Sequence, residues 1–240
     1  MSVESHLKEL FSLEGKTILL TGAAGGIGGA LAKGMAGIGA AVCLCDVSKE
    51  RLLALEEEIR QDGGKAEAYV MDVTKKESIQ HVVSAIAEKY GKIDVLCNVA
   101  GINKREGILD VTEETYDRIM DINLKGVFMV SQEVARYMIR QHGGNIINIG
   151  SHNATAMLGG CSVYGATKSG VVALTRSMAI EWAEWGIRAN AVSPGHILTP
   201  LTQVTWDHPT RGDYLRDRIA MRRPGRPEEL VGLICMLASD

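Results

Sequence analysis

Proline and long apolar runs are both scarce in this chain of 240 residues, which holds five prolines. With 27 glycines beside so few prolines, tight turns and close backbone approaches are expected rather than a proline-rich linker. No apolar run reaches the roughly 18 residues that a membrane-spanning helix needs. Residues 1–16 also lack the basic region and apolar core of a signal peptide. We therefore expect a soluble cytoplasmic protein.

Cysteine and net charge are low as well. The five cysteines are odd in number, scattered and never spaced C-x-x-C, which argues against a disulfide framework and suits a reducing cytoplasm. No cluster of histidine, cysteine and carboxylate has ligand spacing, so we expect no metal. A formal net charge of −3 gives no bulk electrostatic reason to bind nucleic acid or a membrane surface. The expected partner is a small-molecule substrate.

Apolar and amphipathic segments alternate along the chain, and 46% of the residues are hydrophobic. Short apolar runs predict strands at residues 17–21, 41–45, 66–71, 93–97, 145–149 and 188–192. Helical spacing predicts helices at residues 27–38, 48–61, 79–90, 112–130, 131–141 and 164–185. Such alternation with short links predicts an α/β fold, a Rossmann-like doubly wound parallel sheet with helices on both faces. We predict a single domain over residues 1–240. The polar, irregular stretch 199–218 is interpreted as a mobile surface segment or a substrate lid.

A glycine-rich turn follows the first predicted strand. Its glycines permit a tight turn and let backbone N–H groups approach a pyrophosphate, while the N-terminus of the next helix faces the negative charge. Turns of this kind also serve packing alone, so the motif by itself leaves both interpretations open. The residues expected at a dinucleotide are Gly22, Ala24, Gly25, Gly26, Ile27 and Gly28.

Asp46 ends the second predicted strand, 18 residues after Gly28. That spacing is close to the roughly 20 residues expected for the acid that holds the 2′-hydroxyl of the adenosine ribose. A carboxylate there repels a 2′-phosphate, and neither Val47 nor Ser48 supplies a positive charge. We therefore predict NAD, in preference to NADP, as the cofactor.

With these residues placed, the chain resembles the short-chain dehydrogenase/reductase family almost from end to end. The spacing Gly22-x-x-x-Gly26-x-Gly28 is similar to that family's form of the turn. Val99 departs from the pattern, because relatives usually have a second asparagine there. Further cofactor contacts that the resemblance implies are Asp72, Val73, Asn98, Ala100, Gly101, Tyr164, Lys168, Pro194, Gly195, Ile197 and Thr199.

The predicted catalytic residues are Asn123, Ser151, Tyr164 and Lys168. Tyr164 and Lys168 are four residues apart and share one face of a helix. A cation beside a tyrosine stabilises its phenolate, and a pKa shift of about three units needs about 4 kcal/mol. Tyr164 is then the general base or acid, and Ser151 binds the developing alkoxide or carbonyl oxygen. The resemblance implies that Lys168 also holds the nicotinamide ribose and that Asn123 holds a water that relays protons.

Candidate substrate contacts are Arg105, His152, Asn153 and His196, each of which also has an ordinary interpretation as a loop side chain. The opening FSLEGKTILLTGA and the segment AGINKRE resemble gluconate, keto-deoxy-sugar-acid and polyol dehydrogenases. We predict interconversion of a secondary alcohol and a ketone on a sugar acid or a polyol. Steroids, acetoin-type diols and acyl-carrier thioesters stay open as substrates.

Two other functions stay open at this point. A dinucleotide-binding sensor would keep the fold without turnover, and epimerisation or dehydration would use the cofactor without consuming it. The resemblance also implies a homodimer or homotetramer. Relatives continue beyond Asp240 into one more strand, which closes the sheet edge and builds a subunit interface. The chain is therefore expected to lack that strand.

Overall fold

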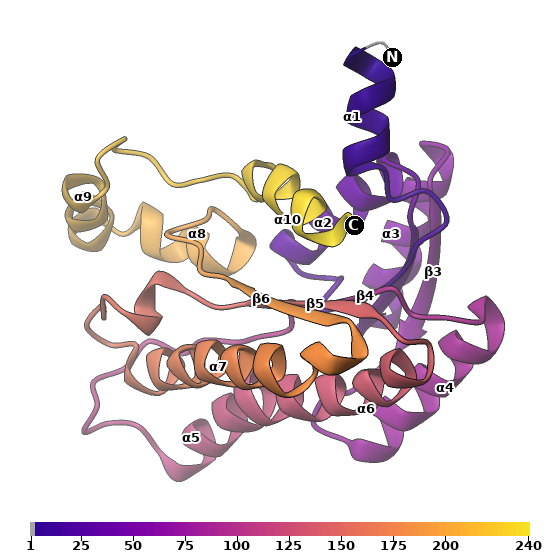
Figure 1. Ribbon diagram of the computed structural model, residues 1–240. Coiled ribbons are helices and arrows are strands. Elements are labelled where there is room, and N and C mark those ends of the chain that lie inside the picture. The colour runs from indigo at the N-terminus through magenta and orange to yellow at the C-terminus, as the bar shows by residue number, and fades with distance from the viewer. Residues whose placement is uncertain (1–2) are drawn as a thin grey trace.

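A parallel sheet of six strands lies at the centre of the computed structural model, which describes residues 3–240 (Figure 1). The strands are β1 (Thr17–Thr21), β2 (Ala41–Asp46), β3 (Lys65–Val70), β4 (Val95–Asn98), β5 (Gly144–Ile149) and β6 (Ile187–Val192). Their order is β3-β2-β1-β4-β5-β6, and every neighbouring pair is parallel. The predicted α/β doubly wound fold is confirmed.

Helices pack on both faces of this sheet. Those on the faces are α2 (Gly26–Gly37), α3 (Lys49–Gln61), α4 (Lys76–Tyr90), α6 (Gly126–Arg140), α7 (Ser162–Glu181) and α10 (Val231–Ala238). Of the others, α1 (Val3–Phe11) projects away from the sheet (Figure 1), α5 (Glu113–Met120) precedes α6, and α8 (Pro200–Asp207) and α9 (Pro209–Arg218) follow β6. No helix among residues 3–240 is long and apolar enough to cross a membrane.

Each face of the sheet has its own apolar core, because successive strand residues point to opposite faces. Ile18 and Leu20 of β1 pack with α2, α3 and α10 on one face. Leu19 packs with α4, α6 and α7 on the other face. Cys43 and Cys45 of β2 point to this second face and belong to its core.

The strand order reverses between β1 and β4, whose carboxyl ends are level. Thr21 is paired with Cys45 of β2 on one side and with Asn98 of β4 on the other. Open α/β sheets bind ligands in the crevice beyond the strand ends at such a reversal. Turns after β1, β2 and β4 therefore meet at this edge.

The region predicted as two helices, 112–130 and 131–141, is one helical rod. A π-helical turn, Asp121–Lys125, joins α5 to α6, and α6 continues to Arg140. The predicted break at Ser131 was wrong because that side chain is fully buried and its Oγ accepts a hydrogen bond from Asn98 Nδ2 at 2.9 Å. A serine that is satisfied by a distant partner no longer competes with the helix backbone.

The segment 199–218 is helical, not irregular as its composition suggested. Thr199 caps α8 in a reciprocal arrangement with Thr202, and a proline begins both α8 and α9. Proline suits the first position of a helix because the missing N–H has no partner there anyway. Both helices lie beyond the end of β6 (Figure 1), so this segment can cover the carboxyl edge of the sheet.

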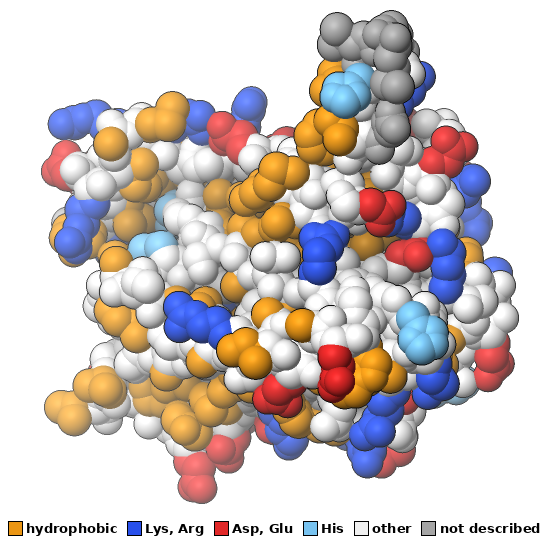
Figure 2. Space-filling view, in the orientation of Figure 1, with side chains coloured by type: hydrophobic (Ala, Val, Ile, Leu, Met, Phe, Trp, Pro, Cys, Tyr) orange, Lys and Arg blue, Asp and Glu red, His pale blue; other side chains and the backbone are white. Residues whose placement is uncertain are grey.

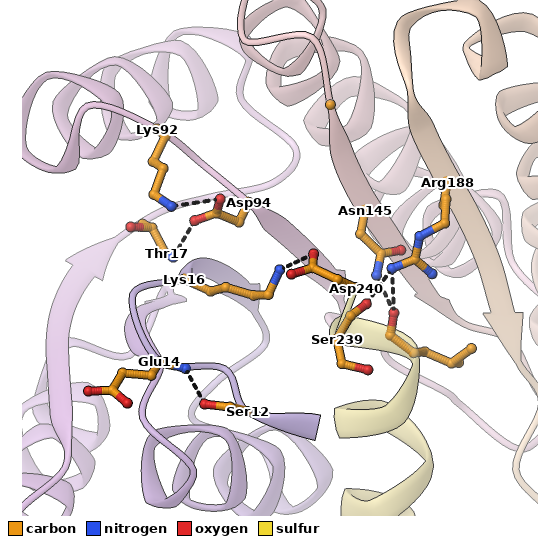
Figure 3. A network of polar contacts seen from close by, with 12 residues as sticks. Ser12, Glu14, Lys16, Thr17, Lys92, Asp94, Asn145, Arg188, Ser239 and Asp240 are labelled. Atoms are coloured by element: carbon orange, nitrogen blue, oxygen red, sulfur yellow. Dashed lines mark hydrogen bonds and ion pairs between the residues drawn. The ribbon is translucent and has the colours of Figure 1, made fainter. Parts of the chain in front are cut away.

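At the amino ends of the strands, polar contacts hold the end of α10 against the sheet (Figure 3). Lys16 forms an ion pair with Asp240 at 2.5 Å. Arg188 of β6 donates to the carbonyl oxygen of Ser239 at 2.6 Å and to that of Leu237 at 3.2 Å. Asn145 of β5 also donates to the Leu237 carbonyl. These contacts fix α10 to the sheet far from the carboxyl edge.

Candidate functional site

Two adjoining clefts lie at the carboxyl edge of the sheet, each with a volume of about 360 Å³. We call the first the glycine-turn cleft, since it follows Gly22–Gly28 and reaches Asp46 and Asp72. The second is the tyrosine cleft, which contains Ser151, Tyr164 and Lys168. Both are lined by Ile27, Val99, Gly101, Ile102, Thr199 and Leu201. One continuous trough therefore crosses the point where the strand order reverses.

The turn between β1 and α2 needs glycine for two separate reasons. Gly22 has a φ of +70°, and a Cβ on it would lie 2.6 Å from the backbone nitrogen of Ala100. A Cβ on Gly28 would lie 2.1 Å from the carbonyl oxygen of Gly22. Gly25 and Gly26 are exposed to the cleft instead, and a Cβ on Gly26 would come within 3.0 Å of Thr199. Gly22 and Gly28 are therefore glycines because the backbone packs closely there. Gly25 and Gly26 leave the cleft open to a ligand.

The N-terminus of α2 opens into the same cleft without a side-chain cap. Gly25 is the N-cap and offers no side-chain acceptor. The first N–H groups of a helix have no partner within the helix. They carry partial positive charge and suit an anion such as a pyrophosphate. The predicted contacts from Gly22 to Gly28 therefore line a cleft that fits a dinucleotide.

Asp46 stands where the spacing predicted, at the end of β2 and on the wall of the glycine-turn cleft. One carboxylate oxygen accepts the N–H of Ala24 at 3.2 Å, and the other accepts the N–H of Ser48 at 3.1 Å. These bonds orient the carboxylate and leave lone pairs on both oxygens. Asp46 can therefore accept hydroxyl donors from a ligand.

Of the other predicted cofactor contacts, only Asn98 points away from the trough. Asp72, Val73, Ala100 and Gly101 line the glycine-turn cleft, and Pro194, Gly195 and Ile197 line the tyrosine cleft. The Asn98 amide is buried instead, and donates to Ser131 Oγ at 2.9 Å and to Asn148 Oδ1 at 2.8 Å. It joins β4 to β5 and α6 behind the cleft wall.

Ser151, Tyr164 and Lys168 come together from two elements. Ser151 follows β5, and Tyr164 and Lys168 lie one turn apart at the start of α7. Lys168 is buried, with Nζ 5.7 Å from the centroid of the Tyr164 ring. Its ammonium donates to the carbonyl oxygen of Ile149 at 2.7 Å. The predicted pair therefore shares a helix face, and that face is turned into the cleft.

The pKa values of this pair follow burial more than mutual attraction. Burial raises the pKa of Tyr164, against the lowering effect of its hydrogen bond with Ser151. Burial also lowers the pKa of Lys168 to about 8. The sequence predicted that Lys168 would bring the pKa of Tyr164 down, but here the lost hydration of the phenolate is the largest effect, and the lowering effects come from Ser151 and Arg105. Because its pKa is raised from the ordinary value of 10.0, the Tyr164 side chain is a neutral phenol at neutral pH.

Asn123 lies in the π-helical turn, fully buried beneath the loop that follows β4. Its Oδ1 accepts the N–H of Ile102 at 2.8 Å, and its Nδ2 donates to the carbonyl oxygen of Ile102 at 2.8 Å. A Cβ on Gly101 would lie 3.4 Å from Asn123 Oδ1 and 3.6 Å from Lys168 Nζ. Asn123 therefore fixes the loop that separates the two clefts and lies close to Lys168.

All four candidate substrate residues line the tyrosine cleft: Arg105, His152, Asn153 and His196. The half-buried Arg105 has no hydrogen bond or ion pair with any residue that the structure describes. Burial, together with the charge of Arg105, lowers the pKa of both histidines. His152 Nδ1 and His196 Nε2 are buried without a hydrogen-bond partner among the described residues. Asn153 is less available, because its Oδ1 accepts the N–H of Leu158 at 3.1 Å.

Sequence reasoning missed two arginines that line the trough. Arg211 of α9 reaches the tyrosine cleft, and Arg51 of α3 reaches the glycine-turn cleft. Figure 2 shows Lys and Arg side chains spread over the end of the molecule that α8 and α9 form. The sequence did hold one signal for Arg211. Pro200 and Pro209 each begin a helix, and recognising these two helix starts would have placed Arg211 on a helix near the end of the sheet.

The tyrosine cleft is cationic. Arg105, Lys168 and Arg211 line it, and within the described part of the chain no aspartate or glutamate does. The glycine-turn cleft differs, since Asp46 and Asp72 lie there. Among residues 3–240 no group of three histidine, cysteine or carboxylate side chains is placed to hold a metal ion.

Known proteins with similar sequences and structures match most of the chain. The family model described as short chain dehydrogenase matches residues 16–210. A 3-oxoacyl-[acyl-carrier-protein] reductase from Thermotoga maritima is 42% identical over 228 residues, which is 95% of this chain and 92% of that protein. An NAD-dependent glycerol dehydrogenase from Listeria innocua is 38% identical over 230 residues, 96% of this chain and 89% of that protein. The crystal structure of a gluconate 5-dehydrogenase from Burkholderia cenocepacia in complex with NADP and tartrate is 36% identical, with a TM-score of 0.93, and the match covers 98% of this chain and 92% of that one.

Proposed function

The chain belongs to the short-chain dehydrogenase family of oxidoreductases, and on that basis we propose that it interconverts a secondary alcohol and a ketone on a sugar acid. The observation that carries this proposal is the composition of the tyrosine cleft. Ser151, Tyr164 and Lys168 lie there beside the unpaired Arg105, with no acidic side chain from the described residues. We further propose NAD as the preferred cofactor, because Asp46 would repel a 2′-phosphate.

The residues present fit a nicotinamide dinucleotide. The uncapped N-terminus of α2 suits the pyrophosphate, and Asp46 suits the hydroxyls of the adenosine ribose. Asp72 and Val73 of the glycine-turn cleft would contact the adenine, and Thr199 and Ile197, which line the tyrosine cleft, would contact the nicotinamide. When bound, the cofactor accepts a hydride from the alcohol or returns one to the ketone.

The chain's own residues then handle the proton and the oxygen. Tyr164 Oη takes the hydroxyl proton during oxidation and donates it back during reduction. Ser151 donates a hydrogen bond to the oxygen that gains charge. Lys168, whose pKa is about 8, holds a proton next to Tyr164, and Asn123 keeps the loop over Lys168 in place. The raised pKa of Tyr164 favours proton donation at neutral pH and oxidation at alkaline pH.

Charge and unsatisfied polar atoms favour a sugar acid over the other candidate substrates. A guanidinium binds a carboxylate through two parallel hydrogen bonds, which Arg105 is free to make. The unpartnered nitrogens His152 Nδ1 and His196 Nε2 suit the hydroxyls of a polyhydroxylated chain. A steroid would leave all three groups buried without partners. The names of the similar proteins refer to three substrate classes: an acyl-carrier thioester, glycerol and gluconate. Membership of the family therefore does not decide which class this chain acts on.

The test is a substrate panel followed by the absorbance of reduced cofactor. The panel contains sugar acids, matched neutral polyols, diols and, for the reverse reaction, a 3-oxoacyl thioester, each with NAD and with NADP. The proposal expects turnover on sugar acids with NAD and its loss in Tyr164→Phe. Turnover confined to the thioester would refute the substrate class. Tight NAD binding without turnover on any substrate would favour a dinucleotide sensor.

A further inference from the structure

Arg51 is an unpaired cation on the wall of the glycine-turn cleft. It lies in the first turn of α3, near Asp46 and Val47, which line the same cleft. Its side chain is exposed and has no hydrogen bond or ion pair with any residue in the described part of the chain. Arg60, on the same helix, differs because it pairs with Glu56 at 2.6 Å. The free guanidinium is therefore available to a ligand at this end of the trough.

The position of Asp46 indicates which part of a bound dinucleotide would lie next to Arg51. The acid at the end of β2 holds the 2′-hydroxyl of the adenosine ribose in sheets of this kind. Its two oxygens are oriented by the N–H groups of Ala24 and Ser48. Any group attached to the 2′-oxygen must therefore enter the space between Asp46, Val47 and Arg51. A 2′-phosphate brings a charge of about −1.5 to −2 into that space.

We propose that Arg51 pairs with the 2′-phosphate of NADP, so that this chain binds both dinucleotides and Asp46 only biases it toward NAD. The proposal rests on the dinucleotide site proposed above and adds a second specificity residue to it. Asp46 repels the phosphate while Arg51 attracts it, and the two opposing charges line one cleft wall. Because both lie near solvent, neither effect is large enough to exclude one cofactor.

The alternative roles of Arg51 predict different patterns. A guanidinium that stacks on the adenine would strengthen NAD and NADP equally. A guanidinium that stays in solvent would affect neither. Only pairing with the 2′-phosphate strengthens NADP alone. Comparing the two cofactors in one variant therefore separates the three roles.

The experiment measures binding by isothermal titration calorimetry, without any substrate. The ligands are NAD, NADP, 5′-AMP and 2′,5′-ADP, and the variant is Arg51→Gln. The matched control is Lys49→Gln, which removes an exposed cation from the same helix turn outside the cleft. We expect Arg51→Gln to weaken NADP and 2′,5′-ADP about 3- to 10-fold, while NAD and 5′-AMP change less than about twofold. Lys49→Gln should change none of the four.

A second pair of variants measures the coupling between the two charges. Asp46→Asn alone should strengthen NADP binding. When Asp46→Asn is combined with Arg51→Gln, the gain in NADP affinity should be clearly smaller. Equal weakening of both cofactors by Arg51→Gln, or unchanged NADP binding, would overturn the proposal while leaving the dinucleotide site intact. If the unaltered protein binds neither NAD nor 5′-AMP, the proposed function itself fails.

Discussion

Replacing Arg105 with glutamine should weaken catalysis on sugar acids much more than on neutral polyols. Arg105 lines the tyrosine cleft, is half-buried and has no partner among the described residues, so a substrate carboxylate would be its first one. A hydrogen bond to a charged group contributes about 1.5 to 3 kcal/mol. Its loss corresponds to a drop of about 10- to 150-fold in kcat/KM for the acid.

The same substitution should move the pH dependence of oxidation. The charge of Arg105 lowers the pKa of Tyr164, although burial raises it more. Removing that charge raises the pKa of Tyr164 further, so the alkaline rise in the oxidation rate should shift to higher pH. The shift should appear with the neutral polyol as well, because it does not depend on the substrate's charge.

Steady-state kinetics on a sugar acid and its neutral polyol give both results. Lys104→Gln is the control, because Lys104 neighbours Arg105 but pairs with Glu106 at 2.8 Å outside the cleft. An equal loss of kcat/KM for acid and polyol in Arg105→Gln would refute the reasoning, since Arg105 would then support the loop and not the carboxylate.

Three further predictions concern stability. Gly22→Ala should lower the melting temperature more than Gly63→Ala, because both residues have positive φ but only at Gly22 does a Cβ meet backbone, 2.6 Å from Ala100; equal losses would contradict this. Asn98→Ala should reduce the free energy of unfolding in urea by about 2 to 4 kcal/mol, because it leaves buried polar partners unsatisfied, and a loss below about 1 kcal/mol would show that the network matters little. Lys168 has a folded pKa near 8 against an ordinary 10.5, so unfolding takes up a proton between these values and stability should rise with pH across that window. That rise should be absent from urea titrations of Lys168→Met; an identical rise in the variant would assign it to other groups.

The parts of the site that the sequence predicted depend on local spacing. The glycine turn and Asp46 both lie within the unit β1-α2-β2, and Tyr164 and Lys168 lie one turn apart within α7. Arg105 was predicted because the carboxyl end of a parallel sheet collects loops, whatever their sequence. The fold was also predicted from local patterns, because strands and helices alternate along the chain with short links.

The parts that were missed depend on contacts between distant segments. Ser131 was taken as a helix boundary, although its partner is Asn98, 33 residues away. The pKa of Tyr164 depends on burial by several loops, which no spacing between two residues reveals. Arg51 and Arg211 were missed because their helices had to be placed against the trough before either side chain could be assigned to it.

The most direct test of the central claim follows hydrogen from substrate to cofactor. A sugar acid deuterated at every carbon is incubated with the protein and NAD, and the cofactor is analysed by mass spectrometry. The account predicts one deuterium in each reduced nicotinamide and none with Tyr164→Phe. Unlabelled cofactor, or conversion of the sugar acid without accumulation of reduced cofactor, would contradict it.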